Sequence, residues 1–252
     1  MKVEIYSDVA CPWCYVGTER LNRALGAFPG ADQVEVVFRP FQLAPEASTT
    51  PRPMSEALRE KFGDMAAVRA AHERLAALGA AEGIAFDFES AQSVNTFTAH
   101  RLLWLAEREG GAATQRRLKT ALLRAQFTEG ADVGDPSVLV ERAVAAGLDR
   151  ERVTAFLAGD EGAAEVARQI DEARRIGVTA VPTFVFEGTW AVQGAQEASV
   201  MLQVLEQVAA ELARDDDPRQ GAATGTDAAT AGRQGHDHAG GDDACADGVC
   251  AV

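Results

Sequence analysis

The chain has 252 residues, of which 47% are hydrophobic, and a formal net charge of −14. A chain of this length can bury a sizeable core in one large domain or two small ones. The negative charge repels phosphate backbones and anionic lipids, and no stretch reaches the roughly 18 apolar residues of a membrane span. We therefore expect neither nucleic acid nor a membrane as a partner.

The N-terminal residues predict a strand, a helix and a second strand. Residues 3–6 alternate apolar and charged side chains, residues 12–27 have apolar positions at helical spacing, and residues 34–38 are rich in valine. Pro29-Gly30 ends the helix. The chain starts with a strand pattern instead of the apolar run of a signal peptide, so we expect a cytoplasmic protein.

A block of helices is predicted over residues 54–176. Ser55 is the expected N-cap of the first helix, with a weak point at Gly63, and Gly110-Gly111 separates two later helices. Each helix is apolar on one face, which is typical of a packed bundle. The expected helices are 56–78, 97–108, 114–127, 136–146, 150–157 and 163–176.

The strand pattern returns after the helical block. Residues 183–186 and 190–192 predict a hairpin, and residues 197–212 predict an amphipathic helix. Without the block, the order β-α-β then β-β-α is the thioredoxin arrangement. We therefore predict an α/β fold in which residues 1–45 and 177–212 form a thioredoxin-like domain, split by an inserted all-helical domain at 46–176.

Residues 213–252 differ in composition from the rest of the chain. They contain eight aspartates against three arginines, and no Leu, Ile, Phe, Met, Trp or Tyr. Such a segment cannot bury enough apolar surface to offset the entropy of ordering, so we expect a flexible acidic tail. This tail carries two of the four cysteines, Cys245 and Cys250.

The other two cysteines form the motif Cys11-Pro12-Trp13-Cys14, directly after the first strand and at the start of the first helix. The free N–H groups of a helix N-terminus stabilise an anion, so the thiolate of Cys11 should be favoured. Cys14 lies one turn along, where it can attack a mixed disulfide on Cys11. We therefore expect Cys11 to be the attacking cysteine and Cys14 the resolving one.

A second signal is Val181-Pro182, immediately before the returning strand. A bond to proline has a small cis penalty. In thioredoxin-like proteins a cis-proline at this point faces the cysteine pair, and the resemblance to them implies that the backbone beside it, at Val181, contacts substrate. An ordinary trans proline that starts a strand is the alternative. Trp13 either shapes substrate contact or simply packs at the surface.

Zinc bound by four thiolates is another use for two cysteine pairs. Zinc knuckles lie in glycine-containing turns, whereas the first pair opens a helix, and the second pair has four intervening residues in a tail expected to be flexible. We therefore predict redox chemistry, with no metal site and no cofactor.

These motifs together resemble the FrnE-type branch of the DsbA-like oxidoreductases over about residues 2–212. The resemblance implies a thioredoxin core with a helical insertion, dithiol/disulfide exchange, and a cis-proline opposite the cysteines. Pro12 and Trp13 replace the histidine-containing pair of periplasmic DsbA, so its strong oxidising power is not implied. The motifs are residues 7–14 (SDVACPWC), 95–102 (NTFTAHRL), 177–184 (GVTAVPTF) and 194–196 (GAQ).

The tail cysteines Cys245 and Cys250 flank Asp247-Gly248, a turn signal that can bring them together. Some FrnE-like proteins are similarly extended by a C-x4-C tail. The linker has an end-to-end distance on the order of 30 Å, enough to reach the first pair. We expect a second redox pair; a solvated tail, or metal binding with His236 and His238, is the alternative.

The function expected from the sequence is reduction or isomerisation of protein disulfides in the cytoplasm, reversed under oxidative stress. Expected partners are protein thiols and disulfides, with glutathione or another small thiol as reductant. One alternative is a glutathione-dependent isomerase or transferase acting on small aromatic compounds; such proteins share the split fold but generally have serine in place of Cys11. Another is a metal-binding thiol protein that works through the tail.

Overall fold

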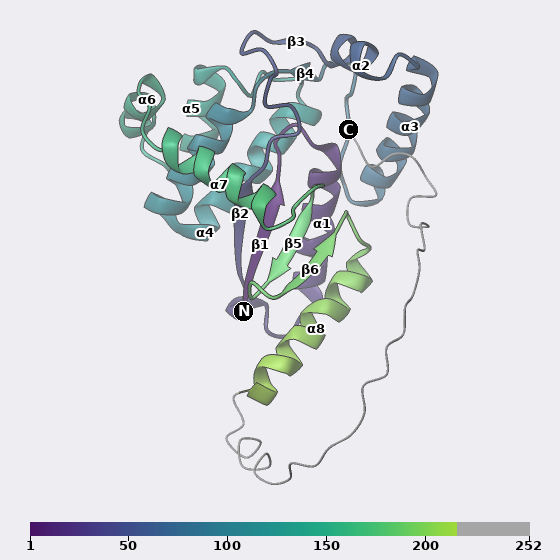
Figure 1. The fold of residues 1–252 in the computed structure, drawn as a ribbon, viewed down its shortest axis with the longest axis vertical. Helices are drawn as coiled ribbons and strands as arrows, with labels where there is room; N and C mark the ends of the chain where they lie inside the picture. The colour runs from purple at the N-terminus through teal and green to yellow at the C-terminus, as the bar shows by residue number, and fades with distance from the viewer. Residues whose placement is uncertain (216–252) are drawn as a thin grey trace, which may run out of the picture.

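The computed structural model describes residues 1–215. The tail cysteines Cys245 and Cys250 and the tail histidines lie outside the described residues. The chain builds a four-stranded sheet with helices around it (Figure 1). Its strands are β1 (Lys2–Ser7), β2 (Glu35–Pro40), β5 (Thr183–Phe186) and β6 (Trp190–Gln193), in the order β2-β1-β5-β6.

The strand directions are those of a thioredoxin-like sheet. β1 runs parallel to β2 and antiparallel to β5, and β5 pairs antiparallel with β6. The parallel pair is joined through helix α1 (Pro12–Ala27), because parallel neighbours need a crossover. The predicted fold class, α/β thioredoxin-like with a helical insertion, is confirmed.

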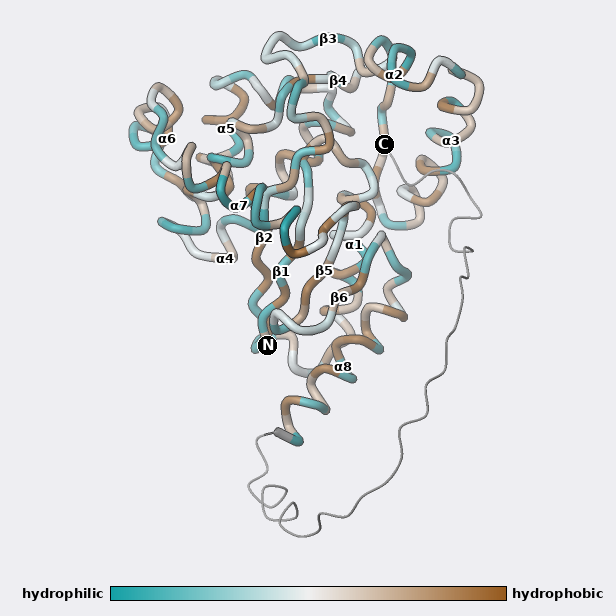
Figure 2. Tube along the Cα trace, viewed as in Figure 1, coloured by the Kyte–Doolittle hydropathy of each residue, from teal (hydrophilic) through white to brown (hydrophobic). Residues whose placement is uncertain are grey.

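One face of the sheet forms a core with α1 and the last helix, α8 (Ala198–Asp215). Figure 2 shows the apolar residues concentrated on the strands and on the inner sides of these helices. Helix α8 continues to Asp215, three residues beyond the predicted end. The buried side chains of this core include Val3, Ile5, Leu21, Leu25, Phe184, Phe186, Met201 and Leu205.

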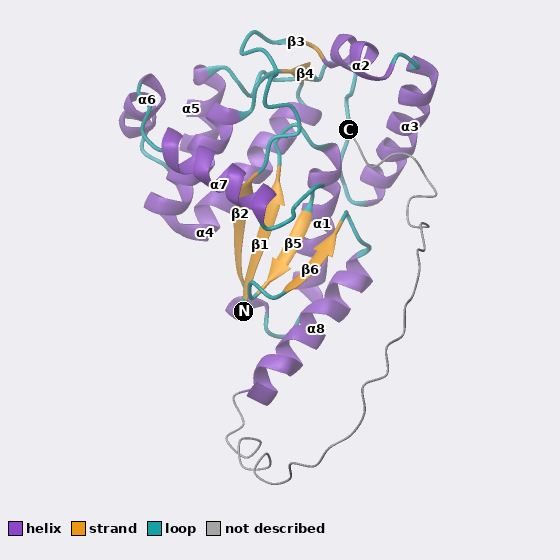
Figure 3. Ribbon diagram, in the orientation of Figure 1, coloured by secondary structure: helices purple, strands orange, loops and turns teal. Residues whose placement is uncertain are grey.

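The helical insertion occupies the chain between β2 and β5 (Figure 3). Its larger part has its own core, built mainly from leucine and alanine side chains. No helix within residues 1–215 is long and apolar enough to cross a membrane. The helices of this part are α4 (Phe97–Phe127), α5 (Pro136–Ala146), α6 (Arg150–Ala158) and α7 (Ala163–Arg175).

Helix α4 consists of the two predicted helical segments, which meet at a kink. Gly111 has φ 74° and ψ 177°, outside the helical range, and no loop separates the two segments. Glycine adopts this conformation at little cost, and the predicted break at Gly110-Gly111 is confirmed as a break in the helical geometry.

The predicted helix 56–78 is instead two helices, α2 (Met54–Phe62) and α3 (Met65–Ala81). They separate at Gly63, where φ is 71°, and Asp64 caps α3 by accepting the N–H groups of Ala66 and Ala67. The predicted N-cap Ser55 does not cap, because α2 already begins at Met54. Two short strands were not predicted, β3 (Arg52–Pro53) and β4 (Gln92–Ser93), and a 3-10 turn spans Ala31–Gln33.

Helix α4 also closes the exposed edge of the sheet. The amide of Gln115 accepts the backbone N–H of Phe38 at 2.8 Å and donates to its carbonyl at 2.9 Å. A side chain from the insertion therefore hydrogen-bonds the free backbone groups of Phe38 on the edge strand β2. Covering an edge in this way prevents it from pairing with another chain. Lys119 follows Gln115 by four residues, so the same face of α4 carries it towards the sheet.

Candidate active site

The cysteine pair lies in the loop and first turn that connect β1 to α1. Cys11 is the N-cap of α1, and Pro12 occupies the first helical position. The Cys11 sulfur accepts the backbone N–H of Cys14 at 3.3 Å, so it meets the positive end of the helix. Both cysteines are free thiols in this structure.

The second predicted motif lies against the first. The Val181–Pro182 bond is cis. The Cys11 sulfur contacts the Val181 carbonyl oxygen at 3.6 Å, across 170 positions of sequence. Both features agree with the sequence-based expectation, and they place the start of β5 directly beside the sulfur of Cys11.

Both thiols are almost closed to solvent. Cys11 is 1% exposed and Cys14 is 0% exposed, whereas Trp13 and Val181 are partly exposed. Trp13 packs against an apolar cluster that includes Tyr15 and reaches the insertion.

Gly17, which the sequence did not single out, permits the close approach of α1 to Pro182. A Cβ atom at Gly17 would lie 2.9 Å from Pro182 Cγ and 3.2 Å from Phe184 Cζ. A ring carbon and an aromatic side chain buried in the core cannot move aside easily. The absence of a side chain at Gly17 therefore allows α1 to lie close to the segment that contains Pro182.

Replacing Gly17 with alanine should lower the free energy of unfolding by about 1–3 kcal/mol, through overpacking. It should also lower disulfide-exchange turnover, because α1 has to move away from Pro182. Denaturant unfolding and a turnover assay measure the two effects. Gly26→Ala is the matched control on the same helix, because no atom lies within 4 Å of a Cβ there; a loss as large in Gly26→Ala would contradict this explanation.

Asp8 ties together three segments beneath the cysteine pair. Its Oδ1 accepts hydrogen bonds from Thr96 Oγ1 at 2.8 Å and from the Ala10 N–H at 3.3 Å, and lies 3.2 Å from His100 Nε2. Its Oδ2 accepts the Leu43 N–H at 2.8 Å. The loop before the cysteines is therefore fixed to the segment after β2 and to the start of α4.

The charge state of this buried group follows from its contacts. Burial raises the pKa of Asp8, but the hydrogen bond and charge of His100 and the Leu43 N–H outweigh it, and the net pKa is lowered. Burial lowers the pKa of His100 despite Asp8. The lowered pKa of Asp8 favours its carboxylate, and the lowered pKa of His100 favours the neutral imidazole, so the two groups ionise as a coupled pair. The sequence analysis included His100 only as part of the motif at 95–102, and the structure makes it the partner of Asp8.

The two thiols lose their protons as a coupled pair. Burial raises the pKa of Cys11 far above the ordinary range, and negative charge on Cys14 raises it further. Burial also opposes ionisation of Cys14, but the Cys11 thiol hydrogen bond and the charge of Lys119 lower the pKa of Cys14. One thiolate is favoured in the pair and a second is disfavoured.

The expectation that the helix N-terminus favours the thiolate of Cys11 stays a prediction. The Cys11 sulfur accepts the Cys14 N–H, as that expectation requires. The charge of Lys119 and the hydrogen bond from Cys11 favour negative charge on Cys14 as well. These contacts together stabilise a single negative charge within the pair.

The fold and the site together define a class of protein: a thioredoxin-like sheet split by helices, with a dithiol at the start of α1 beside a cis-proline. Residues 2–206 match the DSBA-like thioredoxin domain. The chain therefore belongs to the DsbA-like family of thiol–disulfide oxidoreductases.

The chain is also similar to solved structures and to a curated protein. A probable DsbA oxidoreductase from Streptomyces coelicolor is 42% identical, with a TM-score of 0.77 over 84% of this chain and 91% of that one. The cytosolic disulfide reductase DsbM from Pseudomonas aeruginosa, solved with GSH, is 21% identical, with a TM-score of 0.55 over 82% of this chain and 98% of that one, and shows the fold alone. YwbO, an uncharacterized protein of Bacillus subtilis, is 26% identical over 74% of this chain and 87% of its own length.

Proposed function

We propose that this protein reduces and isomerises disulfide bonds of protein substrates, with Cys11 as the attacking thiol and Cys14 as the resolving thiol. The observation that carries the proposal is the buried dithiol at the start of α1, with the Cys11 sulfur 3.6 Å from the Val181 carbonyl. A nucleophile beside an extended segment suits a substrate chain lying along Val181 and Pro182. Proteins of the DsbA-like family act on protein thiols, which supports this substrate class.

The reaction consists of two exchanges. The Cys11 thiolate attacks a substrate disulfide, forming a mixed disulfide and releasing one substrate thiolate. Cys14 then gives its proton to solvent and its thiolate attacks Cys11, so the Cys11–Cys14 bond forms while the bond from Cys11 to the substrate breaks. The substrate gains two electrons and its thiolates take protons from solvent, and the enzyme leaves as a disulfide. A small thiol restores the dithiol; glutathione is proposed here because DsbM was solved with GSH.

Reduction of insulin disulfides with glutathione as the electron source tests this function. We expect turnover above the rate of glutathione alone, and complete dependence on the first cysteine pair. Turnover of a small aromatic substrate with glutathione in Cys14→Ser, without insulin reduction by the unmodified protein, would instead support an isomerase or transferase.

The tail pair Cys245/Cys250 lies outside the described residues, so its role is proposed from sequence alone. We infer that it exchanges with Cys11 and Cys14, passing two electrons from its dithiol to their disulfide. Two moles of glutathione then reduce the tail disulfide. Two features support this inference. Cys245 and Cys250 flank the turn signal Asp247-Gly248, and the linker gives the tail cysteines an effective concentration near the first pair of up to the millimolar range.

Ending the chain after Asp215 should reduce insulin turnover severalfold when glutathione is the sole reductant, while leaving thermal unfolding unchanged. The cut keeps the whole of α8, so the core of the sheet stays intact. The matched full-length control is Cys245→Ser with Cys250→Ser, which should fall equally. Equal turnover of all three proteins would contradict the relay, as would the absence of a Cys11–tail disulfide by mass spectrometry in Cys14→Ser.

A further inference from the structure

Lys119 is a fully buried lysine whose amine is unpaired. Its side chain is 0% exposed, and its Nζ has no hydrogen-bond partner among residues 1–215. The Nζ lies 5.7 Å from the centre of the Phe38 ring, a cation–π contact. A buried ammonium without a hydrogen bond destabilises the folded state, which suggests that Lys119 has a functional role.

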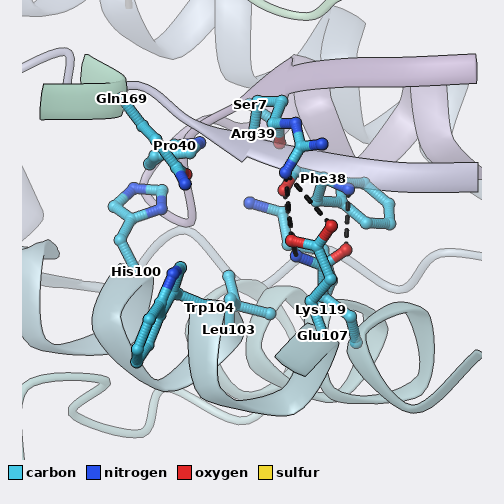
Figure 4. Close-up of a pocket in the computed structure, with 11 residues that line it drawn as sticks. Ser7, Phe38, Arg39, Pro40, His100, Leu103, Trp104, Glu107, Lys119 and Gln169 are labelled. Carbon is cyan, nitrogen blue, oxygen red and sulfur yellow. Dashed lines mark hydrogen bonds and ion pairs between the residues drawn. The ribbon is translucent and has the colours of Figure 1, made fainter. Parts of the chain in front are cut away.

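The amine faces a small cavity between α4 and the sheet, with a volume of about 10 Å³ (Figure 4). Lys119 and His100 reach it from α4, whereas Ser7 and Phe38 belong to β1 and β2. Ser7 is the last residue of β1, four residues before Cys11, so the cavity lies at the end of β1 from which the cysteine loop continues.

Among the charged groups around Lys119 in the described residues, Asp8 supplies a negative charge that does not depend on the redox state. Arg39 and Glu107 pair with each other at 3.0 Å, so their charges cancel, and α7 contributes only the neutral Gln169. Asp8 is an anion in both redox states, whereas the cysteines are negative only when reduced. The titratable groups that face Lys119 are Asp8, Cys11 and Cys14 from the β1–α1 segment, Arg39 from β2, and His100 and Glu107 from α4.

The ionisation of Lys119 is coupled to that of the groups around it. Burial has the largest effect and lowers the pKa of Lys119, and the charges on Cys14, Asp8 and Cys11 oppose that effect without reversing it. The attraction is reciprocal, because a protonated Lys119 stabilises a thiolate on Cys14. Cys14 is 0% exposed, so water contributes little to its ionisation.

We propose that Lys119 is a positioning residue for the resolving step: its charge holds Cys14 as the thiolate that attacks the Cys11–substrate disulfide. The inference rests on the proposed function and assigns a part of it to the inserted helix α4. In that step the Cys14 thiolate bonds to the Cys11 sulfur, and the substrate sulfur leaves as a thiolate that takes its proton from solvent. Lys119 keeps its proton throughout.

The test uses the full chain with Cys245→Ser and Cys250→Ser, so that only the first pair absorbs as thiolate near 240 nm. Adding Lys119→Met should move the midpoint of the first thiolate transition up by about one pH unit. The thiol–disulfide equilibrium between glutathione and the first pair should shift about tenfold towards the Cys11–Cys14 disulfide. This shift corresponds to a reduction potential of the pair that is about 30 mV lower. Insulin turnover should fall at neutral pH and recover as the pH rises.

Gln115→Met is the matched control, because Gln115 is a buried neutral side chain one turn away on the same face of α4. It disturbs the edge of β2 without removing a charge, so the thiolate midpoint should stay in place. An unchanged midpoint and potential in Lys119→Met would overturn the inference while leaving the proposed function intact. Absence of turnover in the unmodified protein would defeat the proposed function itself.

A second measurement covers the case in which Lys119→Met does not fold. In Cys11→Ser, with the tail cysteines also replaced, Cys14 titrates alone and the lysine is untouched. A midpoint below the free-cysteine value of about 8.5 supports the stabilising charge, because burial alone would raise the midpoint. A midpoint above about 8.5 would overturn the inference.

Discussion

Cys11→Ser should reduce insulin disulfide reduction to the rate of glutathione alone. A serine hydroxyl does not form a disulfide, so the first exchange with substrate cannot occur. We do not expect Cys14 to replace Cys11, since Cys14 lies within the first turn of α1, whereas the Cys11 sulfur contacts the Val181 carbonyl. Steady-state turnover, measured at equal protein concentration, gives the result.

Two controls separate chemistry from folding in this experiment. The thermal unfolding of Cys11→Ser should stay close to that of the unmodified protein, because a hydroxyl can still accept the Cys14 N–H. Cys245→Ser with Cys250→Ser should keep measurable turnover, since the first pair remains complete. Substantial insulin reduction by folded Cys11→Ser would show that another group is the nucleophile.

Cys14→Ser should trap the enzyme on its substrate as a covalent mixed disulfide. Cys11 is still able to attack, but no thiol one turn along the helix remains to release the product. Catalytic turnover should therefore fall nearly as far as in Cys11→Ser, while a high-molecular-weight adduct accumulates. Non-reducing electrophoresis and peptide mass spectrometry report the adduct and the cysteine that carries it.

The position of the adduct decides between the two possible assignments of the cysteines. Adduct on Cys11 in Cys14→Ser, and none on Cys14 in Cys11→Ser, is the expected pair of results. The reverse pattern would exchange their roles. This experiment is needed because the two thiols ionise as a coupled pair, so their charges alone do not assign the two roles.

The sequence predicted the order of elements well where periodic patterns are strong. The strands around residues 3–6 and 183–186, and the helix 12–27, all form close to their expected positions. Glycine signals were less decisive. Gly63 ends a helix that was expected to continue, whereas Gly111 breaks the helical geometry where a break was expected. A glycine in a helical stretch indicates where the helix can end or bend. Which of the two occurs depends on how the flanking segments pack.

The candidate site was predictable where its chemistry lies in short motifs. The cysteine pair and Val181-Pro182 are recognisable by spacing and by the strand or helix that follows, and the structure brings them together. Asp8 and His100 both lie in the motifs that carried the resemblance, but no spacing rule joins residues 92 positions apart.

The remaining parts of the site depend on contacts that only the folded chain creates. Lys119 sits in a helix with many polar residues, and nothing in that stretch indicates that its amine would be completely buried. Gly17 looks like a weak point in a helix, and its importance arises from Pro182, which is remote in sequence. Such residues can be found from sequence only through contacts that local periodicity does not encode.

The most direct test of the central claim is a redox titration of Cys11 and Cys14 in glutathione buffers, read by mass spectrometry of the peptides that contain them. We expect one reversible two-electron transition, in which a disulfide bond joins Cys11 to Cys14. Insulin reduction should be lost as this pair becomes oxidised. A pair that stays reduced across the whole range, or insulin reduction that persists after the pair is fully oxidised, would contradict this claim.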